Sequence, residues 1–283
     1  MMINSISTKP SRLKDKRRKL LRKKITIVFL LCLVLLISLS LISRSKGLLI
    51  KDFEINGNNI TKSEDILKGV NSKISGNYLF LFSKKNILIY PRSEIKASVL
   101  DSFKRISNIK IEQGESQLIT LSIEEREGEY LWCNYFDERE TDECYFVAKD
   151  GYIFSEAPYF SGDIFFRFYS YLGDNPVGKN IIESEKFKRL MFFKNNLLKL
   201  SINPHLFFIR GDGDYEFLFN NTSFNRWEAP KIIFKAEDDF EEIYKKLEMV
   251  LRTDPLSLNF QEKLSSLLYI DLRYDGKVPF KFK

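Results

Sequence analysis

Histidine and cysteine are scarce in this 283-residue chain, which has one histidine, His205, and three cysteines. A zinc site draws most of its ligands from these two residue types, and Cys133 and Cys144 have no further ligands near them in the sequence. The acidic run around Asp212 and Asp214 does not complete a calcium loop and is typical of a tight turn. We therefore expect no metal and no bound cofactor.

Motifs of nucleophilic catalysis are missing as well. The chain has no G-x-S-x-G nucleophile elbow. In a sortase the histidine precedes the cysteine, whereas His205 follows every cysteine here. These absences predict a protein that is not an enzyme and has no small-molecule substrate.

The excess positive charge is confined to the N-terminus. The chain carries 45 basic and 38 acidic residues, a net charge of +7. The segment through Lys24 holds ten basic residues against one acid, Asp15, so it accounts for more than the whole excess. A nucleic-acid interface needs a basic face on a folded domain. We therefore expect no nucleic-acid partner and attribute the tail to membrane topology.

One uncharged apolar run, residues 25–42, follows this tail. As a helix it spans about 27 Å, close to the hydrocarbon thickness of a bilayer. A cleaved signal peptide is the competing interpretation, but its apolar region is shorter and ends in small residues, and this chain has no alanine before Ala97. The pattern predicts a basic cytoplasmic tail over residues 1–24, a transmembrane signal anchor over 25–42 that lies in the lipid bilayer, and an exterior position for the rest.

The cysteines Cys133 and Cys144 flank a polar segment, and each adjoins a strand-like run. If these runs pair as a hairpin, the two side chains meet at the base of the loop. A disulfide persists outside the cytoplasm, so we expect a bond between them. Two free thiols in reducing surroundings remain the alternative. The third cysteine, Cys32, lies within the apolar run.

The first exterior region, residues 48–127, predicts the order β-α-α-β-β. Thr61 or Ser63 is expected to cap the first helix, and Pro91 to open the second. The strands are expected at residues 48–55, 106–113 and 117–125.

The second exterior region, residues 128–283, predicts mostly antiparallel strands with flanking helices, which makes the chain α+β. Asp150-Gly151 favours a hairpin. Residues 183–200 and 238–252 favour helices, the second with a capping box from Asp238 to Glu241. The last strand is expected at 267–274, where alternation puts four side chains on one face: Leu268, Ile270, Leu272 and Tyr274.

Together these parts resemble the bacterial cell-division family FtsQ, called DivIB in Gram-positive bacteria. The resemblance covers nearly the whole chain, and its most specific motif is the closing Tyr-Ile-Asp-Leu-Arg-Tyr run at 269–274. Further matches lie at the turn 53–60, the junction 121–126 and the hairpin 145–154, whereas residues 159–177 match nothing in the family. The resemblance implies a POTRA domain at 48–127 and an FtsQ-type β domain at 128–283.

The resemblance also implies a function. Members of the family are non-enzymatic scaffolds of the divisome, located in the cell membrane at the division septum. They bind FtsB-like and FtsL-like proteins and other divisome components, and they offer a sheet edge near the chain's end to a strand of FtsB. The contact residues implied here are Tyr269, Asp271, Arg273, Tyr274, Lys277 and Phe280, with Val278 and Phe282 extending the edge.

For two of these residues a role inside the domain is the alternative to partner contact. Arg273 can form a salt bridge within the domain, and Tyr274 can pack in the core. An alternative function is a POTRA-containing envelope protein that acts in protein assembly or translocation. Such factors usually carry several POTRA units and a barrel, and neither is evident in this sequence.

Overall fold

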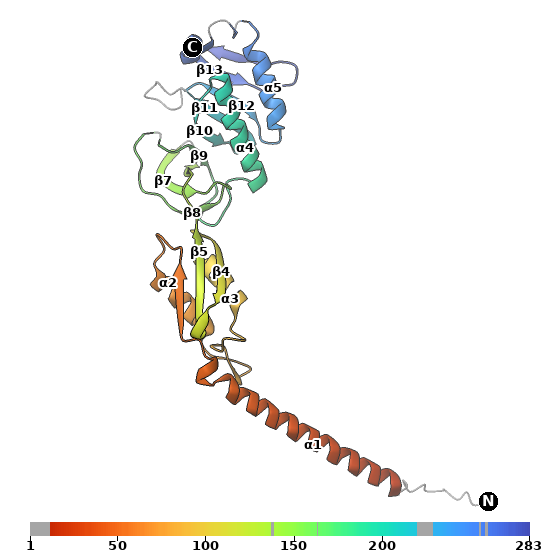
Figure 1. Cartoon of the computed structure of the whole chain (residues 1–283). Coiled ribbons are helices and arrows are strands. Elements are labelled where there is room, and N and C mark those ends of the chain that lie inside the picture. The colour runs from red at the N-terminus through yellow and green to blue at the C-terminus, as the bar shows by residue number, and fades with distance from the viewer. Residues whose placement is uncertain (1–11, 137–138, 163, 220–228, 255, 258–259) are drawn as a thin grey trace, which may run out of the picture. The chain divides into compact units, whose positions relative to one another are not determined.

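The computed structural model describes residues 12–283, except for residues 137–138, 163, 220–228, 255 and 258–259 (Figure 1). The chain divides into two compact units, with the boundary between Glu124 and Glu125. The architecture is α+β with a β-rich second unit, which confirms the predicted fold class at this level.

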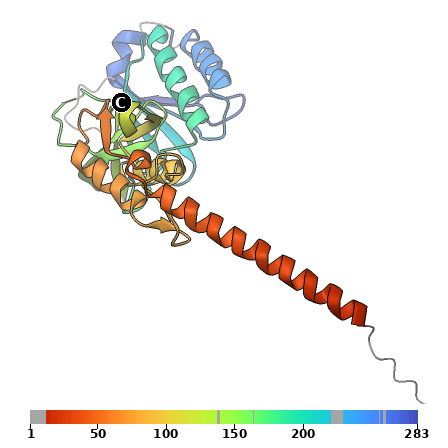
Figure 2. The ribbon, with the colours of Figure 1, turned by 60° about the horizontal axis from the view of Figure 1, so that its bottom comes forward.

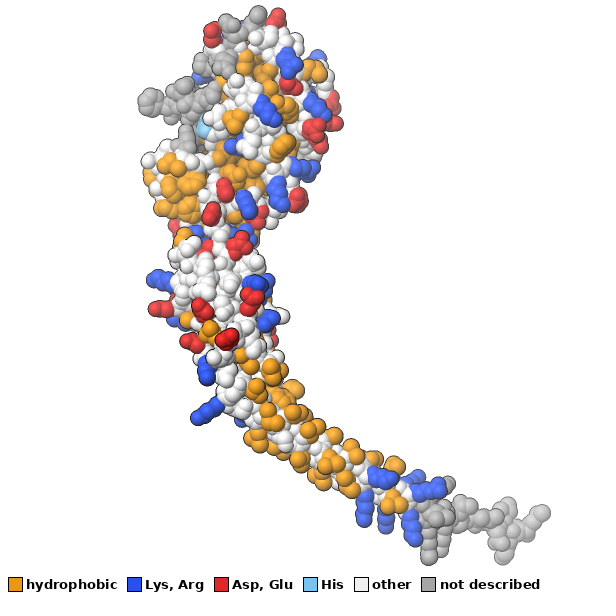
Figure 3. All heavy atoms as spheres, in the orientation of Figure 1, with side chains coloured by type: hydrophobic (Ala, Val, Ile, Leu, Met, Phe, Trp, Pro, Cys, Tyr) orange, Lys and Arg blue, Asp and Glu red, His pale blue; other side chains and the backbone are white. Residues whose placement is uncertain are grey.

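Helix α1 (Arg12–Ser43) is long enough and apolar enough to cross a membrane. It contains the whole run predicted as an anchor and begins earlier, inside the basic tail. Between residues 15 and 47, every side chain is exposed except Ser40 and Ser43. Figure 3 shows hydrophobic side chains covering the helix, with a cluster of basic side chains near its start. This surface fits hydrocarbon, because the backbone polar groups of a helix are paired internally.

The first unit continues with a three-stranded sheet, two longer helices and a small hairpin. Its elements are η1 (Lys46–Leu48), β1 (Asp52–Asn56), α2 (Ser63–Ile74), β2 (Asn77–Tyr78), β3 (Phe82–Ser83), α3 (Arg92–Ser102), β4 (Ile106–Gln113), η2 (Glu115–Gln117) and β5 (Leu118–Glu125). Strand β5 lies between β1 and β4 and runs parallel to β1, with Ile119 opposite Phe53. The hairpin β2–β3 forms a separate sheet.

Sequence periodicity explains how this unit packs. Helix α2 buries Ile66, Val70 and Ile74, which recur every four residues and so share one face. The predicted cap is wrong, because α2 begins at Ser63 and follows Lys62, which makes no side-chain cap bond. Ser63 is the first residue of the helix itself, and its hydroxyl accepts a hydrogen bond from the side-chain amide of Asn58 at 2.9 Å.

The second unit holds a nine-stranded sheet and two main helices. Its elements are β6 (Tyr130–Phe136), β7 (Arg139–Val147), β8 (Ile153–Glu156), β9 (Arg167–Ser170), α4 (Ser184–Leu197), η3 (Leu198–Leu200), β10 (Pro204–Ile209), β11 (Asp214–Phe219), β12 (Lys231–Lys235), α5 (Phe240–Leu251), α6 (Phe260–Lys263), η5 (Leu264–Ser266), β13 (Leu267–Asp271) and β14 (Phe280–Phe282). The strand order is β14-β13-β12-β11-β10-β9-β6-β7-β8.

Most strand pairs in this sheet are antiparallel, as predicted. The parallel pairs are β12 with β13, and β9 with both β10 and β6. Helices α4 and α5 lie side by side (Figures 1 and 2), and the Phe193 and Phe240 rings stack between them with centroids 5.9 Å apart. Both helices pack on one face of the sheet through a core rich in Phe.

The other face of the sheet has a smaller apolar cluster that includes Leu206 and Phe208. Phe160 and Phe165 pack against it from the segment before β9. This segment belongs to residues 159–177, which the sequence left without an assignment.

Two local predictions in the second unit need correction. Asp239, not Asp238, caps α5, since its carboxylate accepts hydrogen bonds from the backbone N–H groups of Glu241 and Glu242. Strand β13 ends at Asp271 rather than at 274, and an irregularity between Leu267 and Tyr269 shifts its register. That shift buries Leu267 in place of Leu268.

Candidate partner-binding edge

The sheet of the second unit ends at strand β14, not at β13. Strand β13 pairs with β12 on one side and with β14 on the other, so it lies inside the sheet. The outermost strand is therefore not the run at 267–274 but the segment with Phe280 and Phe282, which was expected only to extend the edge. The short terminal strand covers β13, and the open edge belongs to Phe280–Phe282.

Alternation along β14 decides which backbone groups face outward. The Pro279 carbonyl accepts from Asp271 N–H at 2.8 Å, and Lys283 N–H donates to the Ser266 carbonyl at 2.7 Å. In an antiparallel ladder, inward and outward residues alternate. Phe280 and Phe282 thus direct their N–H and C=O groups toward the open edge.

A groove of about 540 Å³ lies beside this edge. Its apolar lining comes from Met249, Val250, Leu256, Val278 and Phe280. Its polar lining comes from Lys246, Thr253, Asp254, Asp275, Gly276 and Lys277. An apolar floor with charged groups around it suits a peptide segment that lies along a sheet edge.

Arg273 is held inside the domain. Its Nε donates to Asp271 at 2.9 Å, its Nη2 lies 2.6 Å from the same carboxylate, and Nη1 forms an ion pair with Asp214. The planar guanidinium therefore links the end of β13 to the start of β11. The internal salt bridge considered for Arg273 is present in the structure.

Burial and pairing have opposite effects on Asp271, whose side chain is nearly inaccessible. Burial opposes its ionisation, but the hydrogen bonds and charge of Arg273 outweigh that cost and lower the pKa of the Asp271 carboxyl. The bond to Asp271, with further help from Asp214, raises the pKa of Arg273 despite partial burial. Both groups stay charged at neutral pH.

The other candidate residues have different surroundings. Tyr274 is 53% exposed, so it is not a core residue, and its ring lies 5.7 Å from the Arg273 guanidinium carbon. Tyr269 is half-buried opposite Lys281. Lys277 is exposed and, with Phe280, lines the groove. Lys277, Phe280 and Tyr274 are thus the candidates best placed for contact, whereas Asp271 and Arg273 hold each other.

Helix α5 supplies groove residues that the sequence did not single out. Lys246 Nζ donates to the Leu272 carbonyl at 2.8 Å and also to the Tyr274 carbonyl, which fixes the segment after β13 against the helix. Met249 is exposed at the groove. In the sequence, the only indication of this role for Met249 is that a large apolar residue lies outside the buried stripe of an amphipathic helix.

Neither sequence comparison identifies a relative of this chain: no protein-family model matches it, and no curated protein shows significant similarity to it.

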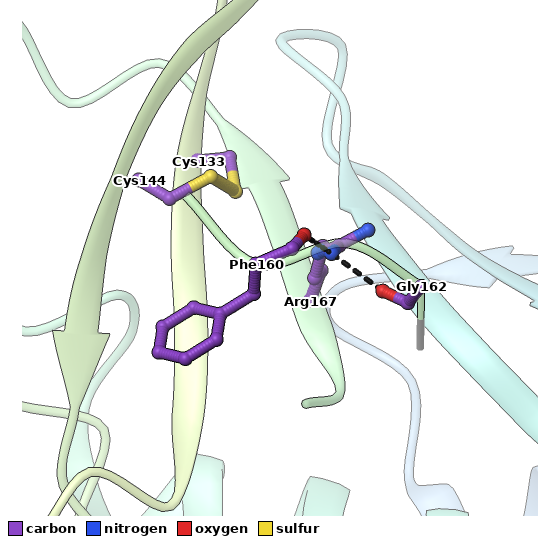
Figure 4. The surroundings of a disulfide bond; sticks show 5 residues. All are labelled: Cys133, Cys144, Phe160, Gly162 and Arg167. Atoms are coloured by element: carbon purple, nitrogen blue, oxygen red, sulfur yellow. Dashed lines mark hydrogen bonds between the residues drawn. A yellow bond between two sulfur atoms is a disulfide. The ribbon is translucent and has the colours of Figure 1, made fainter. Parts of the chain in front are cut away.

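The predicted disulfide is present in the second unit (Figure 4). Cys133 and Cys144 are direct partners in the β6–β7 ladder, with Cα atoms 4.1 Å apart. Nearby, Arg167 donates to the carbonyls of Phe160 and Gly162 at 2.9 and 2.6 Å, as Figure 4 shows. The bond and these contacts secure the half of the sheet opposite to β14.

No three or more His, Cys, Asp or Glu side chains in the described part of the chain gather as metal ligands would.

Proposed function

We propose that the protein is a non-enzymatic scaffold of the bacterial divisome, located in the cell membrane at the division septum. Helix α1 anchors it, the basic tail stays in the cytoplasm, and the part of the first unit after α1 lies outside together with the second unit. The observation that carries the proposal is the open edge of β14 beside an apolar groove. Such an edge can pair with a strand of an FtsB-like partner.

The cell-division role itself rests on the resemblance to the FtsQ/DivIB family. The order of elements in the first unit, with β5 parallel to β1, supports its interpretation as a POTRA domain. The closing Tyr-Ile-Asp-Leu-Arg-Tyr run occupies β13 and the residues after it, next to the candidate edge.

Binding would proceed through main-chain pairing, with side chains adding specificity. Phe280 and Phe282 would offer their outward N–H and C=O groups to the partner strand. Apolar partner residues would enter the groove beside Met249 and Val278. Lys277 would meet an acidic partner side chain, and FtsL-like proteins would join through the same complex.

A pair of substitutions at Phe282 separates backbone pairing from side-chain packing. Both Phe282→Ala and Phe282→Pro remove the ring, but only the proline also removes the outward N–H. We expect the proline variant to lose capture of an immobilised FtsB-like segment to a clearly greater extent than the alanine variant. Equal losses would assign the affinity to the ring, and unchanged capture in both variants would reject β14 as the site.

Depletion in cells tests the biological role. Filamentous or chained cells with few septa are expected. Normal septation combined with defects in protein export or assembly would contradict the divisome proposal and favour the alternative class of POTRA-containing envelope protein.

A further inference from the structure

The hairpin β2–β3 carries two large apolar side chains that the fold leaves uncovered. Leu79 is 82% exposed and Phe80 is 93% exposed. Both sit at the tip of the hairpin, between the paired residues Tyr78 and Phe82. Leu81, next along the chain, is also exposed. Apolar side chains so fully presented to water by a tight turn indicate a binding surface rather than a core.

The backbone of this tip is held in an unusual conformation. Leu79 and Phe80 have φ values of 48° and 63°, which large L side chains rarely adopt. The Leu81 N–H closes the turn on the Tyr78 carbonyl at 2.9 Å. Turns of this kind usually take Asn or Gly at both positions. This turn instead has Leu and Phe, so its two side chains are not explained by the needs of the turn.

The hairpin packs against the last turn of α1. The Ser40 hydroxyl donates to the Leu81 carbonyl at 2.7 Å, and the Asn86 amide donates to the Ser43 carbonyl at 2.9 Å. These contacts explain why Ser40 and Ser43 are the buried exceptions on an otherwise exposed helix. The depth of a hairpin residue in the membrane can therefore be inferred from the residue of α1 beside it.

The direction of the hairpin follows from the same contacts. Ser83 lies level with Ser43, because its N–H donates to the Ser43 hydroxyl at 3.4 Å, whereas Leu81 lies level with Ser40, which is one turn nearer to the middle of the apolar run. Residues 79 and 80 form the tight turn that precedes Leu81, so they lie close to this level. The apolar run is about 27 Å long, slightly shorter than the hydrocarbon layer of roughly 30 Å. A hairpin tip level with Ser40 therefore meets the outer boundary of that layer.

The polar groups of the tip suit such a boundary. The guanidinium of Arg44 donates to the carbonyls of Phe80 and Leu81 at 3.2 and 3.3 Å. Together with Ser40, it satisfies backbone oxygens that would be costly to leave unpaired in a poorly hydrated layer. Tyr78 lies at the base of the turn, and tyrosine is enriched at membrane–water interfaces.

We propose that the tip of β2–β3, centred on Leu79 and Phe80, inserts into the outer boundary of the lipid bilayer as a second membrane contact. It would hold the part of the first unit after α1 against the membrane surface at a second point besides α1. This inference rests on the membrane anchoring in the proposed function, and lipid is the occupant because the patch is continuous with the end of the apolar helix.

Site-directed fluorescence on the full chain tests it. The chain is reconstituted without reductant in vesicles of phosphatidylcholine and phosphatidylglycerol, with and without a doxyl-labelled lipid as quencher. An environment-sensitive dye is attached to one cysteine at a time: native Cys32, or Phe80→Cys or Ile60→Cys in a Cys32→Ala background. Cys133 and Cys144 are bonded and do not take the dye. Ile60 is the matched control, an exposed apolar residue beyond the far end of β1.

We expect the dye at position 80 to emit at shorter wavelength and to lose intensity with the quencher, as the dye at position 32 does. The dye at position 60 should behave as in water. A dye at position 80 that matches the one at position 60 would overturn the hairpin contact, whatever the dye at position 32 shows. Quenching of the dye at position 32 is a separate test of whether α1 lies in the bilayer. A dye at position 32 that is not quenched would contradict the proposed anchoring, even if the dye at position 80 is quenched.

Discussion

The two units of the chain fill their interiors with different side chains. The core of the first unit consists of branched aliphatic residues, among them Ile66, Ile95 and Ile119. The main core of the second unit is a network of rings, in which Phe207, Phe217 and Phe234 contact one another. Each ring buries more apolar surface than an aliphatic side chain, so fewer residues fill the same interior volume.

This difference predicts how strongly the loss of a core side chain should destabilise each unit. A ring in the second unit contacts several other rings, so its loss opens a large cavity. Shortening an isoleucine to valine in the first unit removes a single methylene and leaves a much smaller cavity. Hydrogen exchange of the full chain, read separately for peptides of each unit, measures both responses in one experiment.

The largest expected effect is that of Phe217→Ala. Phe217 is fully buried and its ring contacts Phe193, Phe207 and Phe234. The substitution should cost about 3–5 kcal/mol of unfolding free energy in the second unit. Exchange should accelerate across that unit and stay unchanged in the first. Equal acceleration in both units would show that the two cores unfold together.

Removing the disulfide should have the next largest effect. A Cys133→Ala, Cys144→Ala double variant is expected to lose roughly 2–3 kcal/mol, because the bond restricts the unfolded chain. The loss should be confined to the second unit. Reductant should reproduce it in the native chain and do nothing further to the variant. A reductant effect on the variant would point to another cause.

Arg273→Ala tests the charged cluster at the end of β13. The change leaves the buried Asp271 carboxylate without its main partner and should cost about 1–3 kcal/mol in the second unit. Arg273→Lys is the control that keeps the charge but not the planar fork, and we expect it to recover only part of the loss. Full recovery would mean that charge alone, and not hydrogen-bond geometry, stabilises the cluster.

The same charged cluster predicts that the stability of the second unit depends on pH. The pKa of Asp271 is lowered in the folded chain, so its ionised form stabilises the second unit above the ordinary carboxyl pKa. That stabilisation should be lost as the pH falls through the folded pKa. In Asp271→Asn, exchange near β13 should depend less on pH over this acidic range. An identical pH dependence in both proteins would exclude Asp271 as the cause.

The smallest effect is expected in the first unit. Ile119→Val removes one methylene from a fully buried side chain and keeps its branching. We expect a cost of about 0.5–1.5 kcal/mol, seen only in peptides of the first unit. A much larger cost would show that this aliphatic core adapts no better than the aromatic one, which would remove the contrast between the units.

Local sequence patterns predicted much of the fold because they depend on neighbouring residues. The stripes of α4 and α5, the strand at 106–113, and the Cys133–Cys144 hairpin all follow from periodicity or a nearby turn. Caps were predicted less well. Ser63 and Asp238 have the right side chains for a cap, but the helices begin where Lys62 and Asp239 take the cap positions.

The candidate edge could not be predicted from such local patterns. An alternating run at 267–274 predicts a strand, but it does not say whether a neighbour covers that strand. Phe280 and Phe282 were expected only to extend that edge, and yet their short strand takes the outermost position. The groove beside it joins residues of α5 to residues 275–280, which no periodicity connects.

By itself, the sequence determined the α+β class, an N-terminal helix able to cross a membrane, the main helices and many of the strands, because each depends on composition or on residues a few positions apart. Only the tertiary structure decided that β14 covers β13, that Arg273 pairs with Asp214 fifty-nine residues away, and that Leu79 and Phe80 stand beside the end of α1. These outcomes depend on which distant segments meet, since a side chain's partners are set by packing and not by its place in the chain.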